Sequence, residues 1–369
     1  MDNTDQVRIL HVVTYMGRGG LETMLMNYYR HIDRSKVQFD FLVHRAFRAD
    51  YDDEIESLGG HIFRLPRLVP WSRSYLKKLE QFFQRHPEYK IVHVHQDCLS
   101  SVILKAAKSC GVSVRIAHSH NSNQDKNLKY LIKMIYKKQI PCYATHLFSC
   151  GKEAGDWMFG GAPYQVMNNA IDTQQYRFDA DLRSRVRKEL AIDEDAFVIG
   201  HVGRFHPQKN HKFLIDIFAK VRALNEKAVL LLVGDGDLRT EIEQQAVSLG
   251  VFESIIFAGV RSDVPNLLQA MDCFVFPSLY EGLSMATVEA QASGLPCVFS
   301  DGVPVECAKA NLVQHIPLSA GVSVWADAIL KNKNATRQDT SSQIIKAGYD
   351  IAANAQWLQN FYLEQWKDA

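Results

Sequence analysis

Two glutamates with a fixed spacing are the side chains of this chain that most clearly indicate chemistry. Glu281 follows an apolar run that stops at Pro277, and Glu289 comes eight positions later, about two turns into the helix expected there. A strand, a glycine loop and a helix in this order direct backbone N–H groups toward a phosphate at the helix N-terminus. Glu289 could accept hydrogen bonds from hydroxyl groups on the same ligand. A phosphate joined to a polyol predicts a nucleotide sugar.

A second set of charges follows the first strand expected in the second half of the chain. Arg204 and Lys209 lie in the loop over residues 203–210, at the carboxyl end of that strand. A guanidinium fork and an ammonium point charge both suit a diphosphate, and they would stabilise the charge that develops on a leaving nucleotide. The alternative interpretation is a solvated basic loop.

Two glycines follow the first expected strand and precede a helix. Gly19 and Gly20 would let the backbone approach an anion closely, and the dipole of the helix would favour that anion. A tight strand-to-helix turn also favours glycine, so this motif has little specificity by itself.

Histidines end two strands of the first half. His118 could contact a transferred sugar near its reacting carbon, and His120 is the nearest alternative, although a histidine at a strand end is often structural. His93 and His95 alternate within another strand and are expected to pack or cap. No carboxylate or second histidine falls at ligand spacing around these residues, so no metal site is expected. Asp237 is expected to cap the helix that follows it.

The composition describes a globular protein with no electrostatic preference for nucleic acid. The chain has 369 residues, 47% hydrophobic and 22% charged, with a net charge of +1. Its seven cysteines are scattered and show no zinc-binding spacing, which favours reduced thiols in a cytoplasmic protein. The acidic N-terminus does not resemble a signal peptide, and no apolar run approaches the roughly 18 residues of a membrane span. We therefore expect a cytoplasmic protein.

Strands alternate with helices twice along the chain. Apolar runs that predict strands lie at 7–14, 39–44, 61–65, 90–95, 112–117, 146–150, 197–202, 228–233, 254–258, 273–276 and 296–299. This alternation predicts an α/β fold with parallel sheets. The expected domains are 1–168 and 169–349. A single last helix is expected over 343–366, and the segment 350–369 is expected to pack back on the first domain. Two such Rossmann-like domains would face each other across an interdomain cleft.

The motifs together resemble one family. Gly19-Gly20, Gly203-Arg204 with Lys209-Asn210, Gly234-Asp235-Gly236 and the Glu281–Glu289 spacing resemble the retaining glycosyltransferases of family 4, which have the GT-B fold. The resemblance extends over nearly the whole chain. The segments 118–121 and 144–155 further resemble bacterial capsule and exopolysaccharide members.

This resemblance implies catalytic roles for four residues: His118, Glu281, Arg204 and Lys209. Arg204 and Lys209 would bind the diphosphate of the donor, and the glycine pair 19–20 would close over it from the other domain. His118 would lie beside the anomeric centre of the sugar.

The remaining donor contacts are implied in the same way. Glu289 would hold the ribose hydroxyl groups, while Glu281 and the backbone of Gly282, Leu283 and Ser284 would hold the hexose and a phosphate. Many family members have Gly or Pro at the position of Ser284, whose hydroxyl could instead cap the helix.

The base of the nucleotide would lie near Gly259, Val260 and Arg261. UDP is the expected nucleotide and GDP the alternative. Family members work without a metal, so no cofactor is expected beyond the nucleotide sugar, which is a co-substrate.

Retention of configuration admits two mechanisms. A double displacement needs a carboxylate on the face opposite the leaving group, and the sequence assigns neither glutamate to that place. The family is usually discussed in terms of same-face attack, which we take as the default. Two alternatives to a transferase remain: a nucleotide-sugar epimerase on the same architecture, and a non-catalytic nucleotide-sugar-binding partner of an assembly complex.

A basic helix is expected over residues 126–138. Lys126, Lys129, Lys133 and Lys137 fall on one face, so the helix could rest on an anionic membrane at the inner face and bring the site to a lipid-linked acceptor. The alternative is a solvated helix face covering the core of the first domain.

Overall fold

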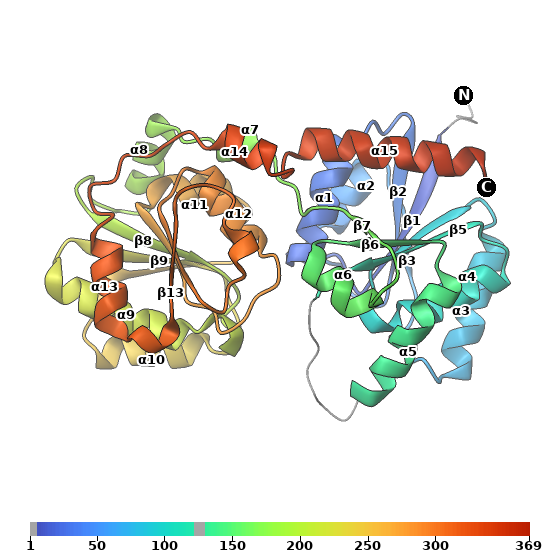
Figure 1. Ribbon diagram of the computed structural model, residues 1–369, viewed down its shortest axis with the longest axis horizontal. Helices are drawn as coiled ribbons and strands as arrows, with labels where there is room; N and C mark the ends of the chain where they lie inside the picture. The colour runs from blue at the N-terminus through green and yellow to red at the C-terminus, as the bar shows by residue number, and fades with distance from the viewer. Residues whose placement is uncertain (1–5, 122–129) are drawn as a thin grey trace. The chain divides into compact units, whose positions relative to one another are not determined.

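The computed structural model describes residues 6–121 and 130–369, which divide into two compact units (Figure 1). Unit 1 comprises Met1–Ile171 together with Asp350–Ala369, and unit 2 comprises Asp172–Tyr349. The chain thus enters unit 2 close to the boundary expected at 168/169, and its C-terminal segment belongs to unit 1.

Unit 1 contains a parallel sheet of seven strands in the order β3-β2-β1-β4-β5-β6-β7. The strands are β1 (Val7–Val13), β2 (Val37–Val43), β3 (Ile62–Arg64), β4 (Ile91–Val94), β5 (Val114–Ser119), β6 (His146–Ser149) and β7 (Gln165–Val166). The helices are α1 (Gly20–His31), α2 (Asp52–Ser57), α3 (Arg73–Arg85), the 3-10 helix η1 (Asp97–Leu99), α4 (Ser100–Ser109), α5 (Tyr130–Tyr143), α6 (Lys152–Phe159) and α15 (Ile351–Lys367).

The two faces of this sheet bury different side chains. Leu10 and Val12 of β1 pack into a core with Leu79 of α3 and Ile103 of α4. Because side chains alternate along a strand, His11 points to the opposite face. On that side α15 packs against β1, β2 and β4.

The helix α15 closes unit 1. It packs against α1, and Figure 1 shows it in red along the blue α1. Leu358 and Tyr362 are fully buried there, and Gln359 Oε1 accepts a hydrogen bond from the backbone N–H of Asp33 at 2.8 Å. The expectation of one helix over 343–366 is wrong. Gly348 has a φ of +84°, which no α-helix accommodates, and it separates α14 (Ser341–Lys346) from α15.

Unit 2 contains a parallel sheet of six strands in the order β10-β9-β8-β11-β12-β13. The strands are β8 (Phe197–Val202), β9 (Ala228–Val233), β10 (Ile255–Gly259), β11 (Cys273–Phe276), β12 (Cys297–Ser300) and β13 (Val313–Ile316). The helices are α7 (Thr173–Tyr176), α8 (Ala180–Glu189), η2 (Pro207–Lys209), α9 (His211–Leu224), α10 (Arg239–Ser248), η3 (Phe252–Ser254), α11 (Val264–Ala270), α12 (Met285–Ala292), η4 (Val305–Cys307), η5 (Leu318–Ala320), α13 (Val322–Leu330) and α14.

Strand order reverses beside the first strand of each sheet. In unit 1 β1 lies between β2 and β4, and in unit 2 β8 lies between β9 and β11. In doubly wound sheets ligands bind outside the carboxyl ends of the strands at such a switch point. The prediction of an α/β fold is confirmed. The switch points make the loops after β1, β4, β8 and β11 the candidate positions for a ligand site.

Candidate functional site

The loops after β8 and β11 meet through a buried ion pair. Lys209 Nζ lies 2.7 Å from Glu281 Oε1, with side chains that are 17% and 6% exposed. The same ammonium lies 4.5 Å from the centroid of the Phe276 ring, a cation–π contact. The structure therefore joins two residues that the sequence placed in separate motifs.

Gln208 joins the same two loops by hydrogen bonds, and no role was predicted for it from the sequence. Its Nε2 donates to the backbone oxygen of Tyr280 at 3.0 Å, and its own backbone oxygen accepts from Leu279 N–H at 2.8 Å. The backbone N–H of Glu281 donates to Gly302 O at 2.9 Å. These bonds fix the position of Glu281 in its loop.

Arg204 lies on the solvent side of this edge. Its side chain is 67% exposed, and Nη2 is 3.4 Å from Asp237 Oδ2, on a side chain that is 85% exposed. An ion pair of this kind contributes little free energy, so the guanidinium can turn to an anion at small cost. The expectation that Asp237 caps the next helix is wrong, because α10 begins only at Arg239 and Leu238 occupies the cap position.

The glycines at 234 and 236 have a packing role. Gly234 has a φ of +132°, and a Cβ there would lie 2.2 Å from Gly203 O. A Cβ at Gly236 would lie 2.6 Å from Phe205 O. Only glycine lets the loops after β8 and β9 approach this closely.

Glu289 is buried on α12. The helix begins at Met285, so Glu289 lies about one turn into it rather than the two turns expected. Burial raises the pKa of Glu289 to about 7, and a hydrogen bond from Tyr176 opposes this rise. Ser284 occupies the N-cap position, but its hydroxyl makes no capping hydrogen bond, so that expectation is wrong. Thr287 Oγ1 donates to Ser284 O at 2.6 Å instead.

The residues expected near the base lie after β10. Gly259 has a φ of +69°, and Val260 is 61% exposed. Both the Nε and the Nη2 of Arg261 lie 2.7 Å from the carboxylate of Asp263. Leu283 and Gly282 are half-buried between Glu281 and α12.

In unit 1 the glycine pair forms the start of α1. Gly19 is the N-cap residue and Gly20 the first helical residue. A Cβ on Gly19 would lie 2.3 Å from Glu22 Oε2, whereas the space beside Gly20 is open. Burial raises the pKa of Glu22 to about 7.

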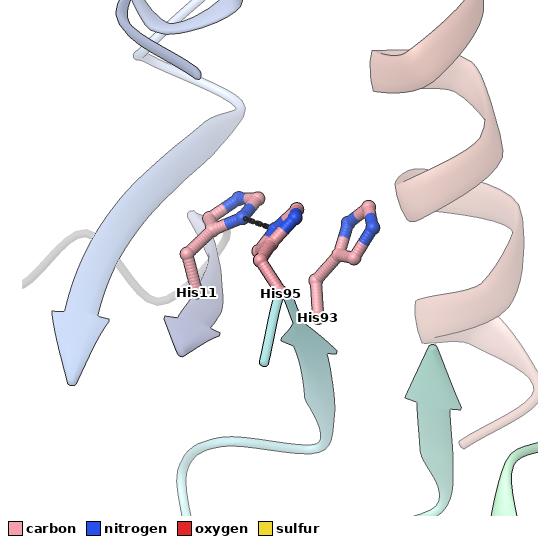
Figure 2. A group of neighbouring side chains, drawn as sticks. All are labelled: His11, His93 and His95. Atoms are coloured by element: carbon pink, nitrogen blue, oxygen red, sulfur yellow. Dashed lines mark hydrogen bonds between the residues drawn. The ribbon is translucent and has the colours of Figure 1, made fainter. Parts of the chain in front are cut away.

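Five histidines gather at the carboxyl edge of the same sheet, and we call them the imidazole cluster: His11, His93, His95, His118 and His120. His11, His93 and His118 lie on the neighbouring strands β1, β4 and β5, and His95 and His120 directly follow β4 and β5. His118 Nδ1 lies 3.1 Å from His93 Nε2. His95 Nε2 lies 3.1 Å from His11 Nδ1, the contact drawn in Figure 2, and its Nδ1 lies 2.9 Å from His120 Nε2.

The imidazole cluster is neutral at pH 7. Burial lowers the pKa of His11 and of His120 to about 3. Burial, with repulsion from the neighbouring imidazoles, holds the pKa values of His93, His95 and His118 well below their ordinary value.

The expectation that no second histidine falls at ligand spacing is wrong. That expectation rested on spacing along the chain, whereas the parallel pairing of β1 with β4 places His11 directly beside His93. Two triads, His11-His93-His95 and His95-His118-His120, each offer three ring nitrogens within 4.8 Å of one another. A signal was present in the sequence, since three expected strands carry histidines near their ends.

Three further features bear on expectations from the sequence: the cysteines, the apolar character of the helices and the basic helix. All seven cysteines are free thiols, and five of them are buried. Among the described residues, no helix combines the length and the apolar character needed to cross a bilayer. Of the expected basic helix 126–138, residues 126–129 lie outside the described part of the chain, and α5 covers the rest.

Two family models match the chain. The model described as "Glycosyl transferases group 1" matches residues 183–311, which include Arg204, Lys209, Glu281 and Glu289. The model described as "Glycosyltransferase Family 4" matches residues 18–175, which include the glycine pair and most of the imidazole cluster.

Individual glycosyltransferases are similar to this chain over most of its length or over part of it. Putative glycosyltransferase EpsF of Bacillus subtilis is 36% identical over 98% of this chain and 97% of its own length. The UDP-Gal:alpha-D-GlcNAc-diphosphoundecaprenol alpha-1,3-galactosyltransferase of Escherichia coli is 27% identical over 58% of each chain. Among solved structures, Anabaena HepE in complex with UDP-glucose has a TM-score of 0.79 and 18% identity, covering 98% of this chain and all of HepE. This structural similarity confirms the expected GT-B fold.

Proposed function

The chain belongs to glycosyltransferase family 4, and on that premise we propose that it is a retaining hexosyltransferase of the EC 2.4 class. It takes a hexose from a UDP-linked donor and passes it to a saccharide or lipid-linked saccharide in the synthesis of a bacterial surface polysaccharide. The observation that carries this proposal is the buried Lys209–Glu281 pair at the switch point of unit 2, with the exposed Arg204 in the same loop as Lys209. The UDP-glucose complex of HepE supports the choice of nucleotide.

Lys209 is suited to hold a diphosphate and Glu281 at once. An ammonium has three N–H donors, and one of them serves Glu281 Oε1. The others can donate to phosphate oxygens, and Arg204 can supply a fork from the solvent side. Glu281 is then positioned to accept from hexose hydroxyl groups, with the backbone of residues 282–284 beside it.

Glu289 is assigned to the ribose. A carboxylate accepts hydrogen bonds from two neighbouring hydroxyl groups, which the protonated acid does less well. Since the pKa of Glu289 is about 7 in the free protein, donor binding should release a proton near neutral pH. We also assign Gly19, Gly20 and His118 to the donor, and the loop at Val260 and Arg261 to the base.

The reaction breaks the bond between the anomeric carbon and the phosphate oxygen, and the nucleotide diphosphate leaves with the electron pair. The acceptor oxygen bonds to the same face of that carbon, and its proton passes to the departing phosphate. Arg204 and Lys209 offset the negative charge that grows on the diphosphate. The chain's own cations serve this purpose, so we propose that transfer needs no metal.

Activity with a purified acceptor tests the proposal. Incubation with UDP-hexoses and lipid-linked or free saccharides should give a product whose anomeric configuration, read by NMR, matches that of the donor. Conversion of the UDP-sugar without an acceptor would identify an epimerase. Donor binding with no turnover under any acceptor would identify a non-catalytic partner, and an inverted product would reject the retaining assignment.

The acceptor side includes α5, which we propose contacts the inner face of the membrane. Leu131 and Ile135 are 73% and 60% exposed there, and Lys137 lies 4.2 Å from the centroid of the Trp157 ring. Exposed apolar side chains among lysines favour an anionic lipid surface. Co-sedimentation with anionic vesicles should fall in Leu131→Ser/Ile135→Ser, while Leu249→Ser, an exposed leucine of unit 2, should bind as the wild type does. Equal binding by all three proteins would reject membrane contact through α5.

A further inference from the structure

The imidazole cluster contains more histidine than the proposed reaction uses. His118 alone has a role at the sugar, yet three other imidazoles pack around its ring and a fourth, that of His11, contacts His95. Ring centroids of His118 and His120 are 4.1 Å apart, and those of His118 and His95 are 5.2 Å apart. The Nε2 of His118 is buried and has no hydrogen-bond partner among the described residues. A buried nitrogen left in this way costs free energy unless a ligand satisfies it.

We propose that His95, His118 and His120 form a binding site for a divalent late transition metal ion, with Zn²⁺ as the best match. Each residue offers one ring nitrogen within 4.8 Å of the nitrogens of the other two. Three imidazoles and a water make a common zinc coordination set. Zinc–nitrogen bonds of about 2.0–2.1 Å in a tetrahedral site put the ligand nitrogens about 3.3 Å apart, so small side-chain rotations close the site.

Two further imidazoles, those of His93 and His11, contact residues of this triad and support the assignment. A metal-ligating histidine usually has its other ring nitrogen hydrogen-bonded, which fixes the orientation of the ring. His93 stands behind His118 at 3.1 Å, and His93 Nδ1 is itself 2.7 Å from the Tyr362 hydroxyl. His11 stands behind His95 at 3.1 Å. His118 can therefore bind an ion through Nε2 without losing its bond to His93.

The other triad, His11-His93-His95, is less suitable. All three side chains are buried, at 0%, 0% and 4% exposure, so an ion there would be removed from water. Both nitrogens of His93 already have partners. His120 is half-buried, which leaves one corner of the proposed site near solvent for the ion's water ligand.

Metal binding at this site has a consequence for the proposed function. Only this consequence, and not the metal site itself, rests on the proposed function. If His118 contacts the transferred sugar, an ion on its Nε2 blocks that contact. Zn²⁺ should then inhibit transfer reversibly, although transfer itself needs no metal.

The binding test needs no activity. The metal-free full chain is titrated with Co²⁺, whose visible absorption reports a tetrahedral nitrogen site, and with Zn²⁺ by calorimetry. We expect one equivalent bound tightly. His120→Asn, at the edge of the cluster, and His118→Asn should each weaken it at least about tenfold, about 1.4 kcal/mol. His146→Asn, a half-buried histidine of β6 outside the cluster, is the matched control and should bind as the wild type does.

Other outcomes overturn the assignment. Absence of a one-equivalent site rejects it, and so does a site unchanged in His120→Asn, which would belong to other histidines of the chain. A site lost in His11→Asn but kept in His120→Asn would move the ion to the buried triad. Circular dichroism and the Tm of each variant separate loss of a ligand from loss of the fold.

A second readout separates this inference from the proposed function. Zn²⁺ inhibition that EDTA reverses, present in the wild type and reduced in His120→Asn, supports both. A Co²⁺ site in a protein that transfers no sugar would leave the metal site standing and reject only the transferase. Transfer unaffected by Zn²⁺ at saturating occupancy would reject the link to His118.

Discussion

Lys209 pairs with Glu281, so substitution of Lys209 affects both the cation and its carboxylate partner. Lys209→Ala removes a cation from the proposed diphosphate site and leaves the carboxylate of Glu281, 6% exposed, without its ammonium. We expect turnover to fall at least about tenfold, about 1.4 kcal/mol of transition-state stabilisation. Steady-state kinetics with the donor measure this.

The matched control for Lys209→Ala is Lys212→Ala. Lys212 is the second residue of α9, is 56% exposed and pairs with Glu241 at 2.7 Å. Its loss should leave turnover within twofold, roughly the effect of an exposed ion pair. Equal losses of turnover in the two variants would mean that the rate depends on the total positive charge, and not on the position of Lys209.

Glu289 gives a prediction with a defined pH range. Its pKa rises from the ordinary 4.5 to about 7 on folding. A raised pKa means that the native state holds its proton more tightly, so this group's contribution to stability is complete below pH 4.5 and is lost as pH rises to about 7. The full change corresponds to about 3 kcal/mol at most. Glu289→Gln should remove this dependence, measured by urea unfolding at several pH values.

The same residue tests the ribose assignment. Glu289→Gln should weaken donor binding at pH 8, where the wild-type carboxylate is ionised, and the difference should shrink toward pH 6. Calorimetry in buffers of different ionisation enthalpy would detect the proton released by the wild type. Donor binding that is independent of pH in both proteins would contradict the assignment.

Among the elements, the crossing of the loops after β8 and β9 depends on glycine. Gly234→Ala would force a Cβ to within 2.2 Å of a backbone oxygen at a φ of +132°. We expect a loss of roughly 2 kcal/mol or more of unfolding free energy and weaker donor binding. Gly161→Ala, where the Cβ meets open space, should change stability by less than about 0.5 kcal/mol.

The helix α15 should contribute strongly to the stability of unit 1. Leu358 is fully buried against that unit, and Leu358→Ala should cost about 2–5 kcal/mol because it leaves a cavity. Gln356→Ala, two residues earlier on the exposed face, should cost less than about 0.5 kcal/mol. Thermal unfolding followed by circular dichroism compares the two. Similar Tm values would mean that α15 adds little to unit 1.

At the scale of the whole molecule, ligand binding should appear as stability. A nucleotide that binds only the folded state at 100 times its Kd raises the unfolding free energy by about 2.7 kcal/mol. We expect UDP and UDP-hexoses to raise the Tm, GDP compounds to have little effect, and EDTA to change neither result. A shift that depends on added Mg²⁺ would contradict metal-free donor binding.

Local signals in the sequence predicted most of the fold and part of the site. Buried parallel strands are apolar on both faces, so 197–202, 228–233 and 273–276 were recognisable as strands without a partner in view. The short edge strands β7 and β13 carry too few apolar residues to be recognised. Helix ends were less certain, and the caps assigned to Ser284 and Asp237 were wrong because cap geometry depends on where the chain turns.

The sequence by itself determined which residue types stand at the ends of the strands, and hence the family and the candidate residues Arg204, Lys209, Glu281 and Glu289. Only the tertiary structure decided which of them meet. The pairing of Lys209 with Glu281, and the gathering of histidines from β1, β4 and β5, depend on strand order in a parallel sheet. Strand order joins residues that are far apart in the chain, and no spacing along the sequence records it.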